Sequence, residues 1–600
     1  MRSLFPVATA PFVADALTHC MPGLHCHTTS GGRATLAARA PAGLAALVAH
    51  STAASSPTEE LRASPMVGDG RVVTGGGGNH RPVLCTMDHF AIPYYFYYYC
   101  CSFCLFLALI INVVVFAHGK KPGGPNMPPG PRQLPLIGSL HHLLRGLPPH
   151  HTMHDLARRH GPIMLLKICE RNLITISSAA AAREIFYDAA FEQRPTTPGI
   201  DELYTRNGMG IVFSPYGDHW RLLRRVLVME LLSSHRVDAF RRIREDEAAR
   251  LVSSLMTSPQ QPGWLANVGE RLGEFVADSV VRAIFGDRLP DRGAFLKMME
   301  QALDFSSIFD LRDLFPSSWL VRMLPRSRKA ERSRREAVRL VGDILRHHEE
   351  RRAGGGGDSE QDMIDVLLRI QKEGTMGVSL TNGVIIAVLV DVFVAAIEAT
   401  TTTLQWAMAE LMANPRVMNK AQSEIRHVLA GHERVHETAL RDAVFLRAVI
   451  KETLRLHPPI PLAPRVCLDD RKIQGYDVPK GTPVILNLWT ISRDPIYWEE
   501  PDKFAPERFE GEHTPNFLGL DFEFIPFGAG RRICPGINFS QANIEIALAS
   551  LLYHFDWDLP AGVRPDDMDM ADYSGVAVRR KAELLLQPIT RIQPVDEYHL

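Results

Sequence analysis

An uncharged apolar run sets the first constraint on what this chain can fold into. From Phe90 to Ala117 no Asp, Glu, Lys or Arg occurs, and tyrosines crowd its first half. A helix needs about 20 such residues to cross the hydrocarbon core of a bilayer, and tyrosine favours the membrane–water interface. We therefore predict a transmembrane signal anchor over residues 87–118. The alternative is a buried core helix.

The flanking charges predict how this anchor is oriented. Lys120 and Lys121 follow the run, whereas Asp88 precedes it. Because basic residues next to a span stay in the cytosol, we predict a single-pass protein whose body faces the cytosol. Residues 119–133 then form a stiff, non-helical Pro-rich hinge around Pro128-Pro129-Gly130-Pro131.

Residues 1–86 form an atypical N-terminal extension. They are rich in Ala, Gly, Ser and Thr and poor in acids, a composition typical of disorder and faintly of transit peptides. Two interpretations stay open, a targeting segment or an upstream extension of the gene prediction with Met87 as the natural start. We favour the second, because a retained tail would carry Arg71 and Arg81 across the membrane.

Residues 134–600 are predicted to be one domain, mainly α with minor β. The net charge of −1 shows no broad electrostatic footprint, so no nucleic-acid partner is expected. Helical periodicity and β-rich runs indicate the elements. The expected helices are Trp220–Leu232, Arg242–Met256, Lys329–Arg352, Thr381–Ala413 and Leu446–Leu456, and the expected strands include Ile163–Ile168 and Val484–Leu488.

A glycine-framed cysteine carries the strongest functional signal. The stretch Phe527-Gly528-Ala529-Gly530-Arg531-Arg532-Ile533-Cys534-Pro535-Gly536 offers three glycines that permit positive φ in a tight loop. Asn538 and Ser540 are expected to cap the next helix, whose positive end would favour a thiolate. The alternative, a buried cysteine in a turn, is disfavoured because five template positions match together: Phe527, Gly530, Arg532, Cys534 and Gly536.

With these residues the chain resembles the cytochrome P450 superfamily, and more closely its plant microsomal, A-type haem-thiolate monooxygenases, from about Met87 onward. The resemblance implies the cytochrome P450 fold, a single haem domain behind the anchor. It makes Cys534 the axial ligand of haem b, where a thiolate donates electron density that favours O–O cleavage. Arg532 would meet a haem propionate, and Phe527 would shield the sulfur.

Two further motifs gain meaning from this resemblance. Glu452 and Arg455 share one helix face, which alone indicates a surface ion pair of little worth. The resemblance implies that they join Arg508 in a buried charge network with a structural role.

Trp220 and Arg224, four apart on a helix, can face one way and donate hydrogen bonds to a carboxylate. The alternative is a core Trp and a solvated Arg. The resemblance gives both a propionate role, together with Arg465, and turns Arg221 and Arg225 toward an acidic electron donor.

The predicted helix Thr381–Ala413 would cross the oxygen side of the haem. Its threonines, Thr400 to Thr403, can compete for backbone carbonyls, so we expect a local bulge that admits O₂ and water. Glu398 supplies an acid for proton relay, and Ala395 and Ala396 leave room. The alternative is a plain core helix with an awkward threonine cluster.

Ala399 departs from the family pattern, which has a proton-delivering Thr at this position. Alanine offers no hydroxyl, so three outcomes are ranked. In the first, Thr400 or an ordered water takes over. In the second, uncoupling rises and oxygenation weakens. In the third, the enzyme runs a rearrangement that needs no protons by this route.

The segment His432-Glu433-Arg434-Val435-His436 matches the H-E-x-x-H pattern of zinc hydrolases. It follows Gly431 among charged residues between two predicted helices, and no third ligand is apparent. We therefore disfavour a zinc hydrolase.

The sequence thus predicts a monooxygenase of the endoplasmic reticulum membrane. Electrons from NADPH would arrive through NADPH-cytochrome P450 reductase, and one oxygen atom of O₂ would enter an apolar small molecule by hydroxylation or epoxidation. The family subgroup suggests plant specialised metabolism and a terpenoid substrate. The expected pocket walls are Ile200–Ile211, Val392–Ala399, Ile460–Ala463 and Tyr573–Val576. Two alternatives are a peroxide isomerase or dehydratase that needs no NADPH, and a non-catalytic haem protein.

Overall fold

The structure is a computed structural model. It describes residues 99–107, 125–144, 146–196, 210–257, 264–286, 293, 311–324, 328–354, 362–374, 380–573, 575 and 577–593. The predicted extension 1–86 and most of the predicted anchor lie outside these residues. The described part of the anchor, 99–107, is helical and exposed at every position.

Most of the described secondary structure is helical, as the sequence predicts. The α-helices are α3 (Leu140–Leu143), α4 (Pro149–His160), α5 (Ala179–Tyr187), α7 (Asp218–Arg225), α8 (Ser234–Ala239), α9 (Arg241–Met256), α10 (Val268–Phe285), α12 (Leu311–Leu314), α13 (Trp319–Arg322), α14 (Arg328–Ala353), α15 (Met363–Glu373), α16 (Asn382–Ala413), α17 (Pro415–Val428), α18 (Val444–Leu456), α19 (Leu488–Ile491) and α20 (Ile537–His554). Shorter helical turns are η1 (Ala189–Phe191), η3 (Val226–Leu231), η4 (Glu437–Asp442), η5 (Pro506–Phe509), η6 (Gly530–Arg532) and η7 (Pro565–Asp567).

The strands form small sheets. They are β1 (Ile163–Ile168), β2 (Arg171–Ile176), β3 (Ala266–Asn267), β4 (Leu462–Val466), β5 (Arg471–Ile473), β6 (Tyr476–Val478), β7 (Pro483–Asn487), β8 (Phe555–Asp558), β9 (Asp572–Tyr573), β10 (Arg579–Arg580) and β11 (Leu585–Thr590). The largest sheet has the order β1-β2-β7-β4, in which β2 and β7 run parallel and the other pairs run antiparallel.

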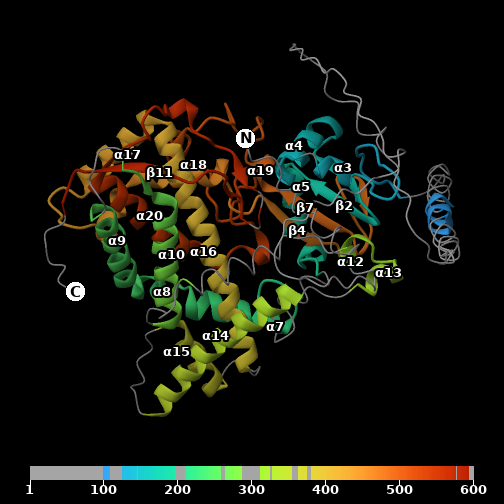
Figure 1. The fold of residues 1–600 in the computed structure, drawn as a ribbon, viewed down its shortest axis with the longest axis horizontal. Coiled ribbons are helices and arrows are strands. Elements are labelled where there is room, and N and C mark those ends of the chain that lie inside the picture. The colour runs from blue at the N-terminus through green and yellow to red at the C-terminus, as the bar shows by residue number, and fades with distance from the viewer. Residues whose placement is uncertain are drawn as a thin grey trace, which may run out of the picture. The chain divides into compact units, whose positions relative to one another are not determined.

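Helix α16 is the central element of the helical part (Figure 1). It packs against α10, α14, α18 and α20. Among the described residues it is the one helix long and apolar enough to cross a bilayer by length and composition. Because several helices contact it, and because Asp391 and Glu410 on it are buried, α16 is a core helix of the folded domain.

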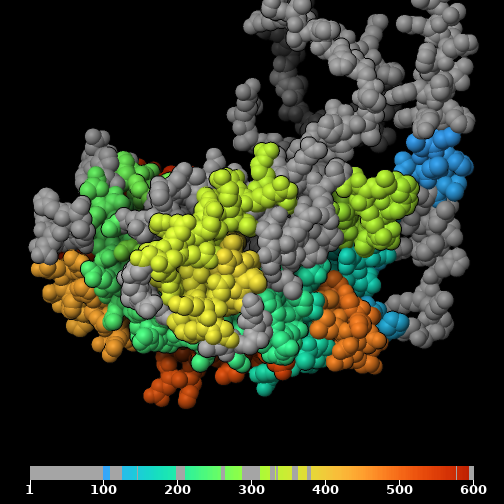
Figure 2. All heavy atoms as spheres, turned by 90° about the horizontal axis from the view of Figure 1, so that it is seen from below, coloured from blue at the N-terminus to red at the C-terminus, as the bar shows by residue number. Residues whose placement is uncertain are grey.

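The surface beside this core is made by α14 and α15. The two helices contact each other, and Figure 2 shows them, yellow-green to yellow, together on one face. Their junction is polar as well as apolar, because His348 on α14 bonds Asp362, the residue that caps α15.

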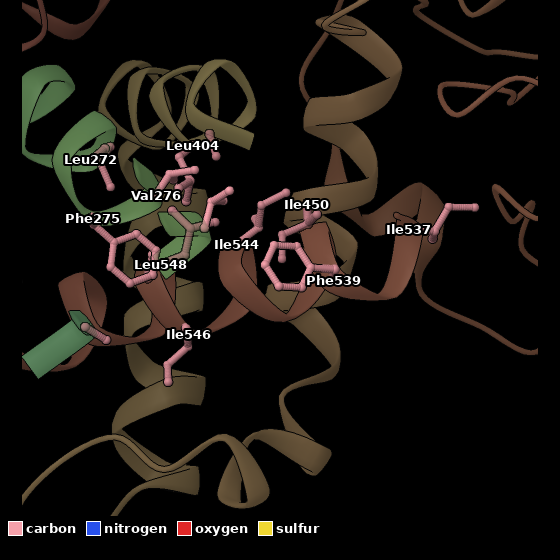
Figure 3. Packing of buried hydrophobic residues seen from close by; sticks show 14 of the residues in the cluster. Leu272, Phe275, Val276, Leu404, Ile450, Ile537, Phe539, Ile544, Ile546 and Leu548 are labelled. Atoms are coloured by element: carbon pink, nitrogen blue, oxygen red, sulfur yellow. The ribbon is translucent and has the colours of Figure 1, made fainter. Parts of the chain in front are cut away.

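The close packing around α20 fixes the start of that helix. Figure 3 shows Leu272, Phe275 and Val276 of α10 facing Ile544 and Leu548 of α20. These side chains belong to one buried cluster, in which all five are at most 3% exposed. Each fully buried aliphatic or aromatic side chain contributes about 1.5–3 kcal/mol, so this contact holds α20 firmly. The segment just before α20 is therefore also held in place.

The sheet carries the second half of the site. Strand β4 places Arg465 opposite Val484 of β7, and Val466 N–H donates to the carbonyl of Gln193 at 2.9 Å. Residues 193–194 consequently lie beside Arg465. The Pro-rich segment is docked on this sheet too, since Leu165 N–H of β1 donates to Pro129 at 2.8 Å.

Three local expectations need correction. The helix expected over Trp220–Leu232 ends as α7 at Arg225 and continues as the π-helical turn η3. The bulge expected at the threonines is absent, because α16 is α-helical at every residue from Asn382 to Ala413. The strand expected over Val484–Leu488 runs one residue earlier as β7.

Candidate functional site

The cysteine loop is held by glycines at two sharp positions. Gly528 and Gly530 have φ of 73° and 66°, and a Cβ on Gly530 would lie 2.6 Å from the carbonyl oxygen of Phe186. Cys534 N–H donates to the carbonyl of Phe527 at 3.0 Å and closes the loop. Any side chain at 530 would therefore push the loop off α5.

Gly536 has a different role from the one expected. Its φ is −94°, so no positive φ is needed there. It is the N-cap of α20, and Asn538 and Ser540 lie inside this helix rather than capping it. The backbone N–H of Gly536 instead bonds the Cys534 sulfur. The helix start thus acts on the sulfur, as expected, through the glycine backbone.

The Cys534 thiol is poised between opposing influences. Desolvation raises its pKa above the ordinary value, while the Gly536 N–H and the charges of Arg224 and Arg194 lower it. Cys534 is half-buried and forms no disulfide. A thiol in this setting gives up its proton to a metal ion, because coordination favours the thiolate far more strongly than these neighbours do.

Four guanidinium groups gather beside this sulfur, and we call them the arginine cluster: Arg194, Arg224, Arg465 and Arg532. Arg465 and Arg532 are buried, and the other two are half-buried. Burial lowers the pKa of Arg465, and repulsion by Arg194 and Arg532 lowers it further. Burial likewise lowers the pKa of Arg532, with Arg194 and Arg224 adding repulsion.

The cluster is short of acceptors. Arg532 donates to the carbonyls of Ser214 at 2.6 Å and Val212 at 3.4 Å, but its Nε has no partner. Among the described residues, the Nε of Arg194 is also buried without a partner, and Arg465 donates to the carbonyl of Pro464 at 2.9 Å and to no other group. Buried charges normally have paired counter-charges. This cluster consequently fits an anionic group that the described part of the chain does not supply.

Two acids act on the cluster, Asp391 of α16 and Glu192, and Glu192 already pairs with Arg531. Burial raises the pKa of Asp391 to about 6, although the N–H groups of Val212 and Ile211 and the charge of Arg194 oppose this. Because Asp391 is disfavoured as an anion and Glu192 is shared with Arg531, these two carboxyls do not balance the four guanidiniums of the arginine cluster. The two carboxylates of a haem, with the iron set toward Cys534, match both the missing charge and the missing ligand.

Arg194 was not predicted from the sequence. It follows η1 in an irregular segment, and no helical or strand periodicity marks it. Trp220, which was predicted, is 4% exposed and lies under the Arg532 guanidinium, whose carbon is 4.8 Å from the ring centroid. The structure therefore brings Trp220, Arg224, Arg465, Arg532 and Cys534 together and adds Arg194.

The middle of α16 supplies an accessible apolar face. Ala395 is exposed and Val392, Ala396 and Ala399 are half-buried, although the helix around them is packed on several sides. Small side chains there leave space that a flat cofactor and an apolar ligand can cover. Of the other expected walls, Ile460–Ala463 is described, while most of Ile200–Ile211 and part of Tyr573–Val576 lie outside the described residues.

Thr400, Thr402 and Thr403 of α16 are buried, unlike the accessible alanines. Thr400 is buried, and its hydroxyl lies 3.0 Å from the hydroxyl of Ser540 on α20. Thr403 donates to the carbonyl of Ala399 at 2.9 Å, the local competition that the sequence predicts. A role for Thr400 in proton transfer therefore requires it to share or exchange its Ser540 partner.

Glu398 is also engaged. Both of its carboxylate oxygens accept hydrogen bonds from the Arg579 guanidinium of β10, one of them at 2.9 Å from Nε. This ion pair ties α16 to the C-terminal strand pair β9–β10. Glu398 lies close to the accessible alanines on the helix. Because Arg579 holds its carboxylate, the relay role predicted for Glu398 requires this ion pair to break.

The predicted charge network is fully formed. Both oxygens of Glu452 accept from Arg455, at 2.7 and 2.8 Å, and Arg508 Nε donates to the same carboxylate at 3.1 Å. Glu452 and Arg455 are 0% exposed. Arg455 also donates to the carbonyls of Ser492 and Pro501 at 2.9 and 2.7 Å. The guanidinium and carboxylate in this network are thus satisfied by the chain itself.

The H-E-x-x-H segment lies on no helix. Residues 432–436 form the turn between α17 and η4, and His436 faces Glu245 at 3.5 Å. Without a helical turn, its two imidazoles are not aligned on one face.

Comparisons with known proteins give one consistent answer. The family model described as cytochrome P450 matches residues 128–586. Desmethyl-deoxy-podophyllotoxin synthase from Sinopodophyllum hexandrum is 42% identical over 496 residues, 81% of this chain and 97% of that protein. Cytochrome P450 71D10 from Glycine max is 40% identical, over 86% of this chain and 99% of that protein. Ent-cassadiene hydroxylase from Oryza sativa subsp. japonica is 44% identical, over 78% and 93%.

Proposed function

This chain belongs to the cytochrome P450 family and is an oxidoreductase that incorporates oxygen, and on that premise we propose that it oxidises an apolar terpenoid with electrons passed from NADPH by a membrane-bound reductase. The observation that carries the proposal is the half-buried Cys534 thiol beside an arginine cluster with too few anions. When bound there, haem supplies O₂ activation through thiolate ligation.

The chain's own residues divide the remaining work. Cys534 would hold the iron, with Gly530 and Gly536 shaping its loop and Phe527 closing it. The arginine cluster and Trp220 would hold the propionates, each guanidinium donating to carboxylate oxygens. Glu398 and Thr400 are the proposed proton carriers, each after releasing the partner it has in this structure.

The substrate class rests on relatives. The rice relative is named as a hydroxylase of ent-cassadiene, and the Sinopodophyllum relative as a desmethyl-deoxy-podophyllotoxin synthase. The alanines of α16 offer an apolar, uncharged wall, which favours a hydrocarbon-rich ligand. We propose a terpenoid and take a phenolic ligand as the competing outcome. Substrate-binding difference spectra over a panel of both classes decide between them.

The location is proposed on the anchor. The described residues 99–107 are helical, and Tyr99, Phe103 and Leu105 on them are 71%, 62% and 73% exposed. Such a helix is not part of the described core, and lipid is a suitable environment for it. We propose a single-pass anchor in the endoplasmic reticulum, with the haem domain and its reductase partner in the cytosol. Fractionation with protease protection tests this.

The central experiment replaces the sulfur. Cys534→Ser should abolish the thiolate-type absorbance of the reduced carbon-monoxide complex and the oxygenase activity. Cys467→Ser is the matched control, since Cys467 is buried and its thiol donates to the carbonyl of Asp469. If the Cys534 variant kept the thiolate spectrum, the ligand assignment would be wrong.

A second experiment tests the departure at Ala399. Ala399→Thr places a hydroxyl on the accessible face of α16, so NADPH use should couple better to product formation. Hydrogen peroxide release per NADPH measures this. Unchanged coupling would show that another route already carries the proton. Turnover of a hydroperoxide without NADPH would instead favour the isomerase or dehydratase alternative.

A further inference from the structure

Two histidines and an aspartate from opposite ends of the domain meet near the wall of the candidate site. His150 and His151 lie in the first turn of α4, and Asp572 begins β9. Both imidazole Nε2 atoms lie 3.0 Å from the same carboxylate oxygen of Asp572. All three ligand-type atoms are within 4.8 Å of one another, and His150 and Asp572 are largely shielded from solvent.

The geometry points to a binding site for a zinc-type divalent cation, held by His150, His151 and Asp572 and completed by solvent. Zn²⁺ takes imidazole nitrogen at about 2.0–2.1 Å and carboxylate oxygen at about 2.0–2.2 Å, so its ligand atoms stand roughly 3.3–3.5 Å apart. The separations of 3.0 Å observed here need only a few tenths of an ångström of opening. Two nitrogens and one oxygen favour Zn²⁺, Co²⁺ or Ni²⁺ over Mg²⁺ or Ca²⁺.

The three groups offer a cation two imidazole nitrogens and one carboxylate oxygen. A bound cation would replace the two Nε2···Oδ2 hydrogen bonds, with each imidazole binding in its neutral form. The guanidinium of Arg493, which acts on His150, is itself engaged: it faces Asp502 at 3.2 Å and stacks on Trp489 at 3.8 Å.

The site is also held from outside its ligands. The carbonyl of His150 accepts from the Asn487 side chain at 2.9 Å, and the ring of His151 lies 4.5 Å from the Trp489 ring. Such supports orient metal ligands before the metal arrives.

A second cluster of the same kind, in the described part of the chain, already has its positive charge supplied by arginines. His348, Asp362 and Asp365 also lie within ligand distance of one another. There, however, Arg351 approaches Asp365 at 3.3 Å and Asp362 at 3.9 Å, and Arg352 approaches Asp365 at 4.0 Å. Those guanidiniums already supply the positive charge. Among the described residues, no guanidinium or ammonium forms an ion pair with Asp572, which faces the two imidazoles.

A cation here would fix part of the site wall. It would join α4 to β9, and β9 pairs with β10 through Arg579↔Tyr573. Because Arg579 also holds Glu398 of α16, the strand pair lies between the proposed metal site and the oxygen-side helix. The bound ion would therefore restrain the segment that carries the Glu398 partner.

The test uses untagged, full-length, haem-loaded protein freed of loose metal by a chelator. Dialysis against Zn²⁺ followed by elemental analysis should find one equivalent of zinc per protein chain, and Zn²⁺ but not Mg²⁺ should raise the thermal midpoint. His151→Gln and Asp572→Asn should each weaken zinc binding at least about tenfold. His160→Gln, at the other end of α4, is the matched control and should bind like the wild type.

The outcomes separate this proposal from the proposed oxidation. Haem content and activity are measured on the same samples. A protein that lacks haem and activity but still binds zinc through His151 would support the metal site and refute the proposed oxidation. A protein that binds no zinc, or whose His151→Gln and Asp572→Asn variants keep the wild-type stoichiometry and affinity, overturns the site. Zinc lost equally in the His160 variant would mark surface binding and overturn it as well.

Discussion

Two groups of buried arginines in this molecule differ in what balances them. In the charge network, Arg455 is 0% exposed and meets both oxygens of Glu452, and backbone carbonyls accept its remaining hydrogens. In the arginine cluster, Arg465 and Arg532 are nearly as buried, but they face other arginines, and the Nε of Arg532 has no partner.

The contrast indicates that the charge network serves folding, whereas the arginine cluster serves ligand binding. A buried guanidinium with a matched carboxylate and full hydrogen bonding is complete when the chain folds. One that is repelled by its neighbours and short of acceptors makes the folded chain less stable until an anion arrives. The charge network is therefore complete without a ligand, whereas the arginine cluster favours the binding of a ligand that bears carboxylates.

The largest expected effect comes from breaking the matched group. Glu452→Gln leaves Arg455 buried without its counter-charge, which should reduce the free energy of unfolding by about 3–5 kcal/mol. The loss should be similar with and without haem, measured by urea unfolding. Glu507→Gln is the control, because its pair with Arg416 is exposed and should matter by less than about 1 kcal/mol. A loss confined to the haem-loaded form would contradict the distinction.

The next largest effect is a pH dependence of the free energy of unfolding, caused by Asp391 beside the arginine cluster. Burial raises the pKa of Asp391 from 3.8 to about 6 in the folded chain. An acid whose pKa is higher when folded binds more protons in that state, so its contribution is fully present below about pH 4 and is lost as pH rises through about 6. At about 1.36 kcal/mol per pKa unit this amounts to roughly 3 kcal/mol. Asp391→Asn should remove that step from the haem-free protein.

The comparison for Asp391 is a pair of unfolding curves recorded at pH 4 and pH 7. The wild type should lose more stability between these pH values than the Asn variant does. Equal losses would mean that Asp391 is already paired in the haem-free chain and that the cluster is better balanced than we infer.

At Arg465 we expect a smaller effect, in which a substitution stabilises the haem-free protein but weakens haem binding. Arg465→Met removes a buried, repelled charge and keeps most of the side-chain volume, so the haem-free protein should gain about 1–3 kcal/mol. Haem binding should weaken by about tenfold or more, because a hydrogen bond to a charged group is worth about 1.5–3 kcal/mol. Unfolding without haem and transfer of haem to an acceptor protein measure the two. Destabilisation of both states would show that Arg465 is structural.

The smallest expected effect is at Arg508 of the charge network. Arg508→Lys keeps the charge near Glu452 but loses the Nε hydrogen bond at 3.1 Å and the bond to the carbonyl of Glu500 at 2.8 Å. Arg508 is partly exposed, so the loss should be about 0.5–1.5 kcal/mol. A loss as large as that of Glu452→Gln would show that Arg508, rather than Arg455, is the main partner.

Local patterns account for what could be predicted. Glu452 and Arg455 are three residues apart on α18, so helical spacing alone brings them together. The cysteine loop was found because its glycines, its arginine and its sulfur lie within ten consecutive residues. The extents of α9, α14, α16 and strand β1 follow from hydrophobic periodicity to within a residue or two.

Errors arose where a side chain's partner lies far along the chain. Asn538 and Ser540 were expected to cap a helix, but packing of α20 on α10 and α16 starts that helix at Ile537, so Ser540 meets Thr400 instead. Four consecutive threonines indicated a bulge, yet α16 is α-helical throughout and packs against neighbouring helices. Propensity is a weak local preference, and tertiary packing overrides it.

The sequence by itself determined the family and the mainly helical architecture, and it singled out the cysteine that we propose as the sulfur ligand, because each is encoded in contiguous residues. Only the tertiary structure decided that Arg194 joins the arginine cluster, that Glu398 rests on Arg579, and that His150 and His151 meet Asp572. These contacts join residues far apart in the chain, with 181 positions between Glu398 and Arg579 and 422 between His150 and Asp572. Burial, charge repulsion and shared hydrogen-bond partners come into being only when the packed chain brings such residues within a few ångströms.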